Sequence, residues 1–105
     1  MWFGRGRHAA TDGQRRRTGN QRREHLERLG RAVGARPGFK CRVGEEGGVH
    51  ALHVEKGGTS LEVGCDFRDG RWWFTWPGDG RAIVPVAALY GAVRVIVQEL
   101  GGARA

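Results

Sequence analysis

The chain has 105 residues, a length typical of one domain, and a formal net charge of +7. All of that charge lies in the first third, because residues 1–36 hold ten arginines and three acidic residues, whereas residues 37–105 hold eight basic and eight acidic residues. No run of roughly 18 apolar residues exists, which excludes a membrane-spanning helix, and two cysteines are too few for a secreted disulfide scaffold. We expect a cytoplasmic protein.

Residues 1–18 hold glycine, arginine and polar residues without an apolar period, so we predict a disordered arginine-rich arm. The run Thr18-Gly19-Asn20-Gln21 has the spacing of a capping box. Three apolar residues then fall at i, i+3 and i+7, namely Leu26, Leu29 and Val33. This stripe predicts a helix over roughly residues 20–33, which Gly34 and Pro37 end.

The middle of the chain alternates apolar and polar residues with a period of two, the pattern of half-buried strands. Four apolar sets carry the pattern: Phe39, Cys41 and Val43; His50, Leu52 and Val54; Leu61, Val63, Cys65 and Phe67; and Trp72, Phe74 and Trp76. Glycine-rich turns separate them, so the segment predicts an antiparallel meander of four strands. Residues 81–84 are a candidate fifth strand.

Two of the turns predict the register of the sheet. A two-residue loop at Asp69-Gly70 pairs Phe67 with Trp72, Cys65 with Phe74 and Val63 with Trp76. A two-residue loop at Gly57-Gly58 pairs Val54 with Leu61, Leu52 with Val63 and His50 with Cys65. Both hairpins then place their apolar side chains on the same face, whereas a slip of one residue would expose the whole set.

The last segment predicts a helix that begins with Pro85 at its first position and ends at Gly101-Gly102. Its core stripe comprises Leu89, Val93, Ile96, Val97 and Leu100, widened by Val86, Tyr90 and Val95. The chain thus predicts an α+β fold of order α-β-β-β-β-α, a single small domain with an antiparallel four- to five-stranded meander flanked by two helices. We place the arm at residues 1–18, the compact domain at 19–101 and a tail at 102–105.

The run Gly70-Arg71-Trp72-Trp73-Phe74-Thr75-Trp76, followed by Ile83-Val84-Pro85 and an Ala/Val-rich helix, resembles a group of small uncharacterised actinobacterial proteins. The resemblance covers roughly residues 24–100. It implies a short leading helix, a meander with a Trp-rich strand, and a closing helix, and no particular function. Members of that group carry acidic residues after the proline, where this chain has Val86-Ala87-Ala88.

The order of elements also resembles a double-stranded-RNA-binding domain. That module holds phosphates with lysines at the start of its second helix, and residues 85–93 contain no lysine or arginine. The resemblance is therefore one of topology alone.

Two groups of reactive residues are candidates for chemistry. Cys41, Cys65 and His50 would share the core face. The two cysteines would lie two strands apart, which is too far for a disulfide, and the three residues lack the fourth ligand and the close spacing of a zinc site. His53 would lie opposite Glu62 on the other face, with Asp66 further along, where an acid–base pair has no pocket to shift its pKa. We therefore predict a protein without catalytic residues, cofactor or metal, and not an enzyme.

Trp73 is predicted to point away from the core, with Arg68 and Arg71 beside it at the end of the hairpin. Exposed tryptophan flanked by arginine is typical of interaction hot spots. Our leading hypothesis is a non-enzymatic interaction or regulatory module that docks a partner protein through this open sheet face.

The alternative is a nucleic-acid-associated protein whose arm makes non-specific phosphate contacts. The candidate residues are Arg15, Arg16, Arg17, Arg22 and Arg23. A second interpretation of the same arm is a solvated tail that keeps the domain soluble. The sequence leaves the oligomeric state open.

Overall fold

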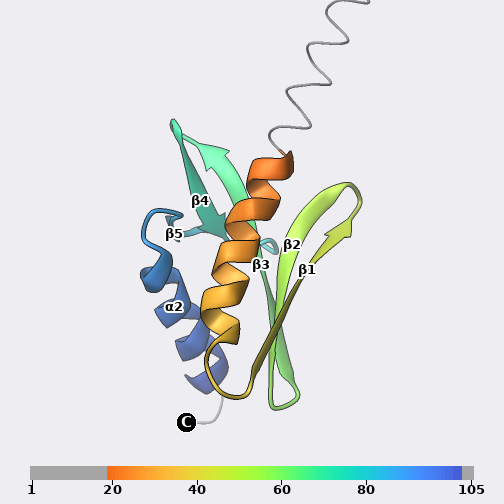
Figure 1. Cartoon of the computed structure of the whole chain (residues 1–105). Helices are drawn as coiled ribbons and strands as arrows, with labels where there is room; N and C mark the ends of the chain where they lie inside the picture. The colour runs from red at the N-terminus through yellow and green to blue at the C-terminus, as the bar shows by residue number, and fades with distance from the viewer. Residues whose placement is uncertain (1–18, 103–105) are drawn as a thin grey trace, which may run out of the picture.

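A computed structural model describes residues 19–102 (Figure 1). The predicted arm at residues 1–18, with Thr18 of the capping box, and residues 103–105 of the predicted tail lie outside the described residues. Residues 19–34 are helical. Five strands and a second helix follow: β1 (Phe39–Glu46), β2 (Val49–Lys56), β3 (Thr59–Arg68), β4 (Arg71–Thr75), β5 (Ala82–Pro85) and α2 (Leu89–Gly102).

The strands form one antiparallel sheet in the order β1-β2-β3-β4-β5, which confirms the predicted α+β meander and its fifth strand. Three two-residue turns connect the first four strands: Gly47-Gly48, Gly57-Gly58 and Asp69-Gly70. All six turn residues have positive φ angles, between 51° and 85°. This is the type I′ geometry that matches the twist of a hairpin, and glycine adopts it without steric cost.

The predicted register is correct next to the turns. Leu52 pairs with Val63 and Val54 with Leu61 between β2 and β3. Phe67 pairs with Trp72 and Cys65 with Phe74 between β3 and β4. These pairings place alternate apolar side chains of the first four strands on one face.

The two halves of β3 pair with different neighbours. Pairing with β2 stops at Leu52 and Val63, and pairing with β4 begins at Gly64 and Thr75. The predicted pairings of His50 with Cys65 and of Val63 with Trp76 were therefore wrong. The sheet forks at this junction, because β2 pairs only with the first half of β3 and β4 only with the second half.

Both helices pack against the same face of the sheet, and the side chains between them form one core (Figure 1). The first helix contributes Leu26, Leu29 and Val33, the residues of the predicted stripe. The second helix contributes Ala92, Val93, Ile96 and Leu100. Gly30 allows close packing, because a Cβ atom there would lie 3.0 Å from Leu52 Cδ1 on β2.

The second helix begins later than predicted. Pro85 does not start α2 but ends β5, where it pairs with Trp73 of β4. The residue after it continues the ladder, since the Val86 amide donates to the Trp72 carbonyl at 3.0 Å. Proline suits this position because an edge strand tolerates a missing N–H group. Helix α2 then starts at Leu89.

Two aromatic residues predicted to be in the core are exposed. Phe67 is 57% exposed and Tyr90 is 79% exposed. Phe67 lies on the core face but near the end of β3, and its ring forms an edge-type pair with Trp72, at 5.6 Å between centroids. Tyr90 lies in the first turn of α2, on the side away from the sheet.

We expect Ile96→Ala to lower the free energy of unfolding by about 2–5 kcal/mol, because it opens a cavity in the core. Tyr90→Ala, on the same helix, should change it by less than about 0.5 kcal/mol, because this side chain contacts mainly water. Urea unfolding followed by tryptophan fluorescence measures both. A comparable loss in the two variants would contradict the orientation of α2.

Candidate docking site on the uncovered sheet face

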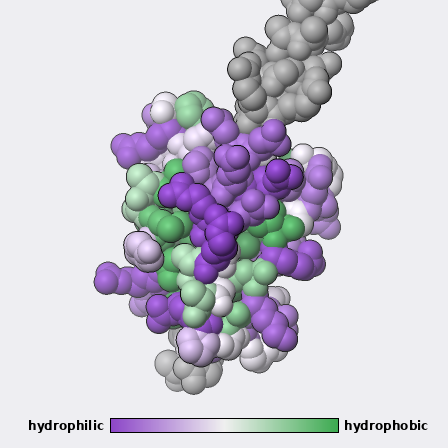
Figure 2. Space-filling view, viewed as in Figure 1, coloured by the Kyte–Doolittle hydropathy of each residue, from purple (hydrophilic) through white to green (hydrophobic). Residues whose placement is uncertain are grey.

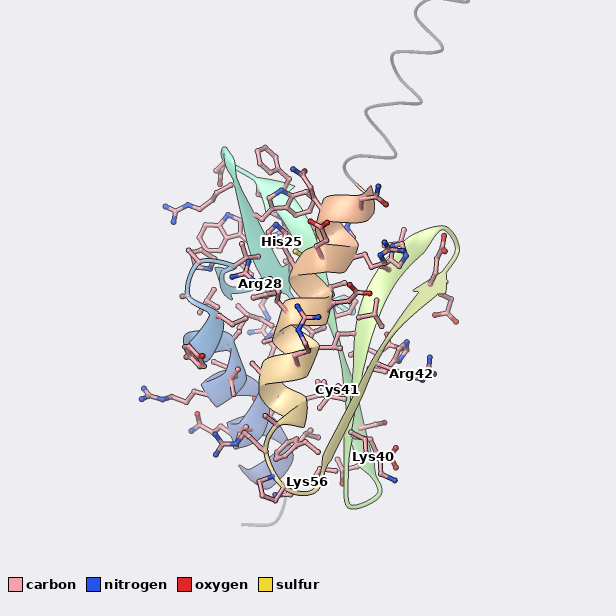
Figure 3. All side chains as sticks on the ribbon, in the orientation of Figure 1. His25, Arg28, Lys40, Cys41, Arg42 and Lys56 are labelled. Carbon is pink, nitrogen blue, oxygen red and sulfur yellow. The ribbon has the colours of Figure 1, made fainter. Side chains whose placement is uncertain are left out.

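Because both helices cover one face of the sheet, the opposite face, which we call the outer face, has no helix against it. Its first three strands form a shallow groove of about 580 Å³. Polar side chains from alternate positions line most of it: Lys40, Arg42, His53, Glu55, Ser60 and Glu62. Figure 3 shows Lys40 and Arg42 pointing away from the first helix, whereas Cys41 between them points toward it.

One row of this groove carries an imidazole–carboxylate pair. His53 pairs with Arg42 of β1 on one side and with Glu62 of β3 on the other, and the pairing with Glu62 was predicted. The His53 Nδ1 atom is 3.0 Å from Glu62 Oε2. Gly44 leaves room beside it, because a Cβ there would lie 3.0 Å from Arg42 Nη1 and 3.3 Å from His53 Nε2. The His53 and Glu62 side chains are 29% and 45% exposed, so water reaches the pair and weakens its electrostatic coupling.

Trp73 lies on the outer face of β4, as the alternation predicted, and is half-buried. Its indole Nε1 donates a hydrogen bond to the Arg68 carbonyl at 3.1 Å. In the sheet Trp73 pairs with Asp66 of β3 on one side and with Pro85 of β5 on the other. The indole is thus held in one orientation by a backbone contact and two neighbouring strands.

The two arginines beside Trp73 differ in their partners. Arg68 donates to Asp66 Oδ2 at 3.1 Å, so its charge is compensated locally. Arg71 is exposed and stacks on the Trp73 ring, with Cζ 5.2 Å from the ring centroid. No carboxylate of residues 19–102 lies within ion-pair distance of Arg71. The predicted cluster of Trp73, Arg68 and Arg71 is therefore brought together, with Arg71 as its uncompensated charge.

Arg22 is the principal contact that sequence reasoning missed. Its Nε atom donates to the Cys65 carbonyl at 2.7 Å, and its Nη2 atom lies 3.6 Å from Asp66 Oδ1. The type I′ turn at Gly57-Gly58 fixes the direction of the Cys65 carbonyl, which faces the side where β2 has ended. Arg22 therefore supplies the hydrogen bond that a strand would have made.

The same end of the first helix covers Trp72. The Arg22 guanidinium lies 5.7 Å from the Trp72 ring centroid, and the His25 ring lies 5.4 Å from it. Partial burial lowers the pKa of His25, and the positive charge of Arg28 lowers it further. Through these contacts the start of the first helix packs against β3 and β4 at the point where the sheet forks.

The predicted phosphate-binding arginines fall into three groups. Arg15, Arg16 and Arg17 lie outside the described residues. Arg22 is only 21% exposed and bonded to β3. Arg23 is exposed and 3.9 Å from Glu27 on the next turn of the helix. The exposed side of this helix, which also carries Arg28 and Arg31, is hydrophilic (Figure 2).

The two thiols and His50 do not form a common site. Cys65 is buried, Cys41 is half-buried, and both are free thiols. His50 Nε2 lies instead 3.9 Å from Glu45 Oε1, its neighbour on β1. No three His, Cys, Asp or Glu side chains gather into a metal-binding group within residues 19–102.

Comparison of the chain with protein-family models, curated proteins and solved structures found no match. The resemblance to small actinobacterial proteins therefore stays a prediction. Within the described part of the chain, no helix is both long enough and apolar enough to cross a membrane.

We expect Arg22→Met to lower the free energy of unfolding by about 1–3 kcal/mol, because it leaves the Cys65 carbonyl unpaired while keeping the apolar part of the side chain. Arg23→Met is the matched control and should cost less than about 0.5 kcal/mol, since its ion pair is half-exposed. Equal effects in urea unfolding would show that Arg22 does not support β3.

The thiols should differ in reactivity. Burial raises the pKa of Cys65 to about 12, with the Arg22 guanidinium opposing the rise, and burial also raises the pKa of Cys41. At pH 8 only about one Cys65 thiol in 10⁴ is then ionised, and the thiolate is the nucleophile. We expect Ellman's reagent to label Cys41 in the folded protein and Cys65 only on unfolding. Fast native-state labelling of Cys65 in a Cys41→Ala variant would contradict this.

Proposed function

We propose that the protein is a non-enzymatic interaction module that docks a partner protein on its outer face. The observation that carries the proposal is the arrangement of Trp73 and Arg71 on a sheet face that neither helix covers. Tryptophan and arginine dominate binding energy at protein interfaces, and an anchor already held in position loses little entropy on binding. Trp73 meets that condition through its hydrogen bond to the Arg68 carbonyl.

The chemistry of the cluster suggests the kind of surface that it would bind. Arg71 has its guanidinium group over the Trp73 ring and no carboxylate partner within the described chain. A carboxylate from the partner would supply the missing counter-charge, and an apolar group beside it would pack on Trp73 and Pro85. The partner surface would therefore present an acidic side chain next to an apolar one.

Site-specific photo-crosslinking in the source organism tests this proposal. A photoreactive residue replaces Ala82, an exposed residue of the neighbouring strand β5, or Gln98, an exposed residue of α2 on the helix-covered side. We expect a discrete protein adduct from position 82 and none of the same mass from position 98. Arg71→Glu should abolish the adduct at position 82, because it replaces the uncompensated cation by an anion.

The matched control is Arg94→Glu, the same change of charge at an exposed position of α2, which should leave the adduct intact. Absence of an adduct at position 82, or equal loss with Arg71→Glu and Arg94→Glu, would contradict docking through Trp73 and Arg71. Thermal unfolding of each variant separates a lost contact from a lost fold.

A second candidate function is non-specific binding of nucleic acid. It is favoured by the confinement of the net charge of +7 to residues 1–36. The exposed Arg23, Arg28 and Arg31 on the first helix would extend the phosphate-binding surface of Arg15, Arg16 and Arg17. Crosslinking from position 23 in a cell lysate would then give a nuclease-sensitive adduct, in a yield that falls as the salt concentration during irradiation rises.

A further inference from the structure

Strand β1 is a long, regular edge of the sheet. It is the terminal strand, eight residues long, and its register with β2 runs without interruption from Phe39 to Glu46. Natural sheets protect their edges by shortness, proline, bulges or charged side chains, and β1 has only the charged side chains, which are of both signs. The opposite edge has the first three, since β5 has four residues, ends in Pro85 and pairs with β4 through a register shift. Strand β1 has none of these three features.

The backbone groups on this edge can be assigned from the turn that follows. Residues flanking a two-residue turn form a hydrogen-bonded pair, so Glu46 bonds to Val49, and alternate residues before it bond to β2. The N–H and C=O groups of Cys41, Val43 and Glu45 therefore point away from the sheet. Within residues 19–102 no other backbone or side-chain group bonds to them.

The helix above the sheet leaves this edge accessible. The first helix packs over the core face of both β1 and β2, because a Cβ on Gly30 would lie 3.0 Å from Leu52 Cδ1 on β2 and 3.7 Å from Cys41 Cβ on β1. Between that helix and β1 there is a hollow of about 350 Å³, to which Glu27 and Arg31 contribute from the helix and Val43 from the strand. An added strand would extend the sheet without displacing the helix.

The charges along β1 are arranged so that the strand complements itself. Its first half carries Lys40 and Arg42, and its last two residues are Glu45 and Glu46. Two copies of such a strand, paired antiparallel, bring the basic half of each against the acidic half of the other. Opposite charges in cross-strand positions stabilise a sheet, and like charges destabilise it.

We propose that the protein forms a symmetric dimer in which the β1 strands of two copies pair antiparallel and join their sheets into one. The register centred on Val43 satisfies both the backbone and the charges. It pairs Val43 with Val43, Cys41 with Glu45, Lys40 with Glu46 and Arg42 with Gly44 of the second copy. In this register the free backbone groups of Cys41, Val43 and Glu45 bond to those of the second copy. Lys40 of each copy faces Glu46 of the other.

Neighbouring registers fit less well. Centring the pair on Arg42 would place the two Arg42 side chains opposite each other. Centring it on Gly44 would pair Arg42 with Glu46 but shorten the overlap to residues 42–46 and leave Lys40 without a partner. The dimer does not depend on the proposed docking through Trp73, which lies on β4, at the other side of the sheet.

Sedimentation velocity of the full chain over a wide range of concentration tests the dimer. We expect a monomer–dimer equilibrium with a dimer of twice 11.6 kDa, weakened by salt. Lys40→Glu should raise the dissociation constant roughly tenfold or more, because each dimer then contains two pairs of facing glutamates. The combined variant Lys40→Glu with Glu46→Lys should restore dimerisation, because the exchanged charges again face each other.

The control for charge is Glu99→Lys, on an exposed position of α2, which should leave the equilibrium unchanged. Hydrogen exchange provides a test without substitutions: the amides of Cys41, Val43 and Glu45 should become more protected as concentration rises, and those of β5 should not. A monomer at every concentration would overturn the proposal. So would a dimer that ignores Lys40→Glu, that is not restored by the combined variant, or that protects a different surface.

Discussion

The geometry of three two-residue turns determines which side chains of the sheet meet. Positive φ angles at Gly47-Gly48, Gly57-Gly58 and Asp69-Gly70 align each pair of strands so that alternate apolar residues share one face. A single apolar face needs cover on one side only, and both helices supply it there. The outer face is consequently left to polar residues and Trp73, and β1, the first strand in the order of the described residues, is left as an edge.

Much of the fold could be predicted because it is encoded locally. Turn residues and alternation predicted four strands and the register near two of the three turns, and helical spacing predicted the core stripe of the first helix. Prediction failed where a distant element decides the outcome. Pairing of His50 with Cys65 required knowing that β2 and β3 separate, and Pro85 fits the last position of an edge strand as well as the first turn of a helix. Phe67 has the right alternation but lies beyond the reach of the helices.

The candidate site was predictable to a similar degree. Alternation placed Trp73 on the outer face and His53 opposite Glu62, because both follow from register. The bond from the Trp73 indole to the Arg68 carbonyl depends on side-chain rotamers, which no pattern in the sequence reveals. Arg22 reads as one arginine among many in a basic segment, and its contact with Cys65, 43 residues away, has no local signal.

The fork at β3 affects how the molecule assembles and opens. Every strand pair joins neighbours in the chain through a short connection, so the sheet has few pairings between distant segments, a property associated with rapid folding. No ladder crosses from Val63 to Gly64, so the β1–β2–β3 hairpins and the β3–β4–β5 hairpins are separate hydrogen-bonded units. These units are coupled through the shared strand β3, the helices and the core, and the two halves of the sheet can open locally as distinct foldons.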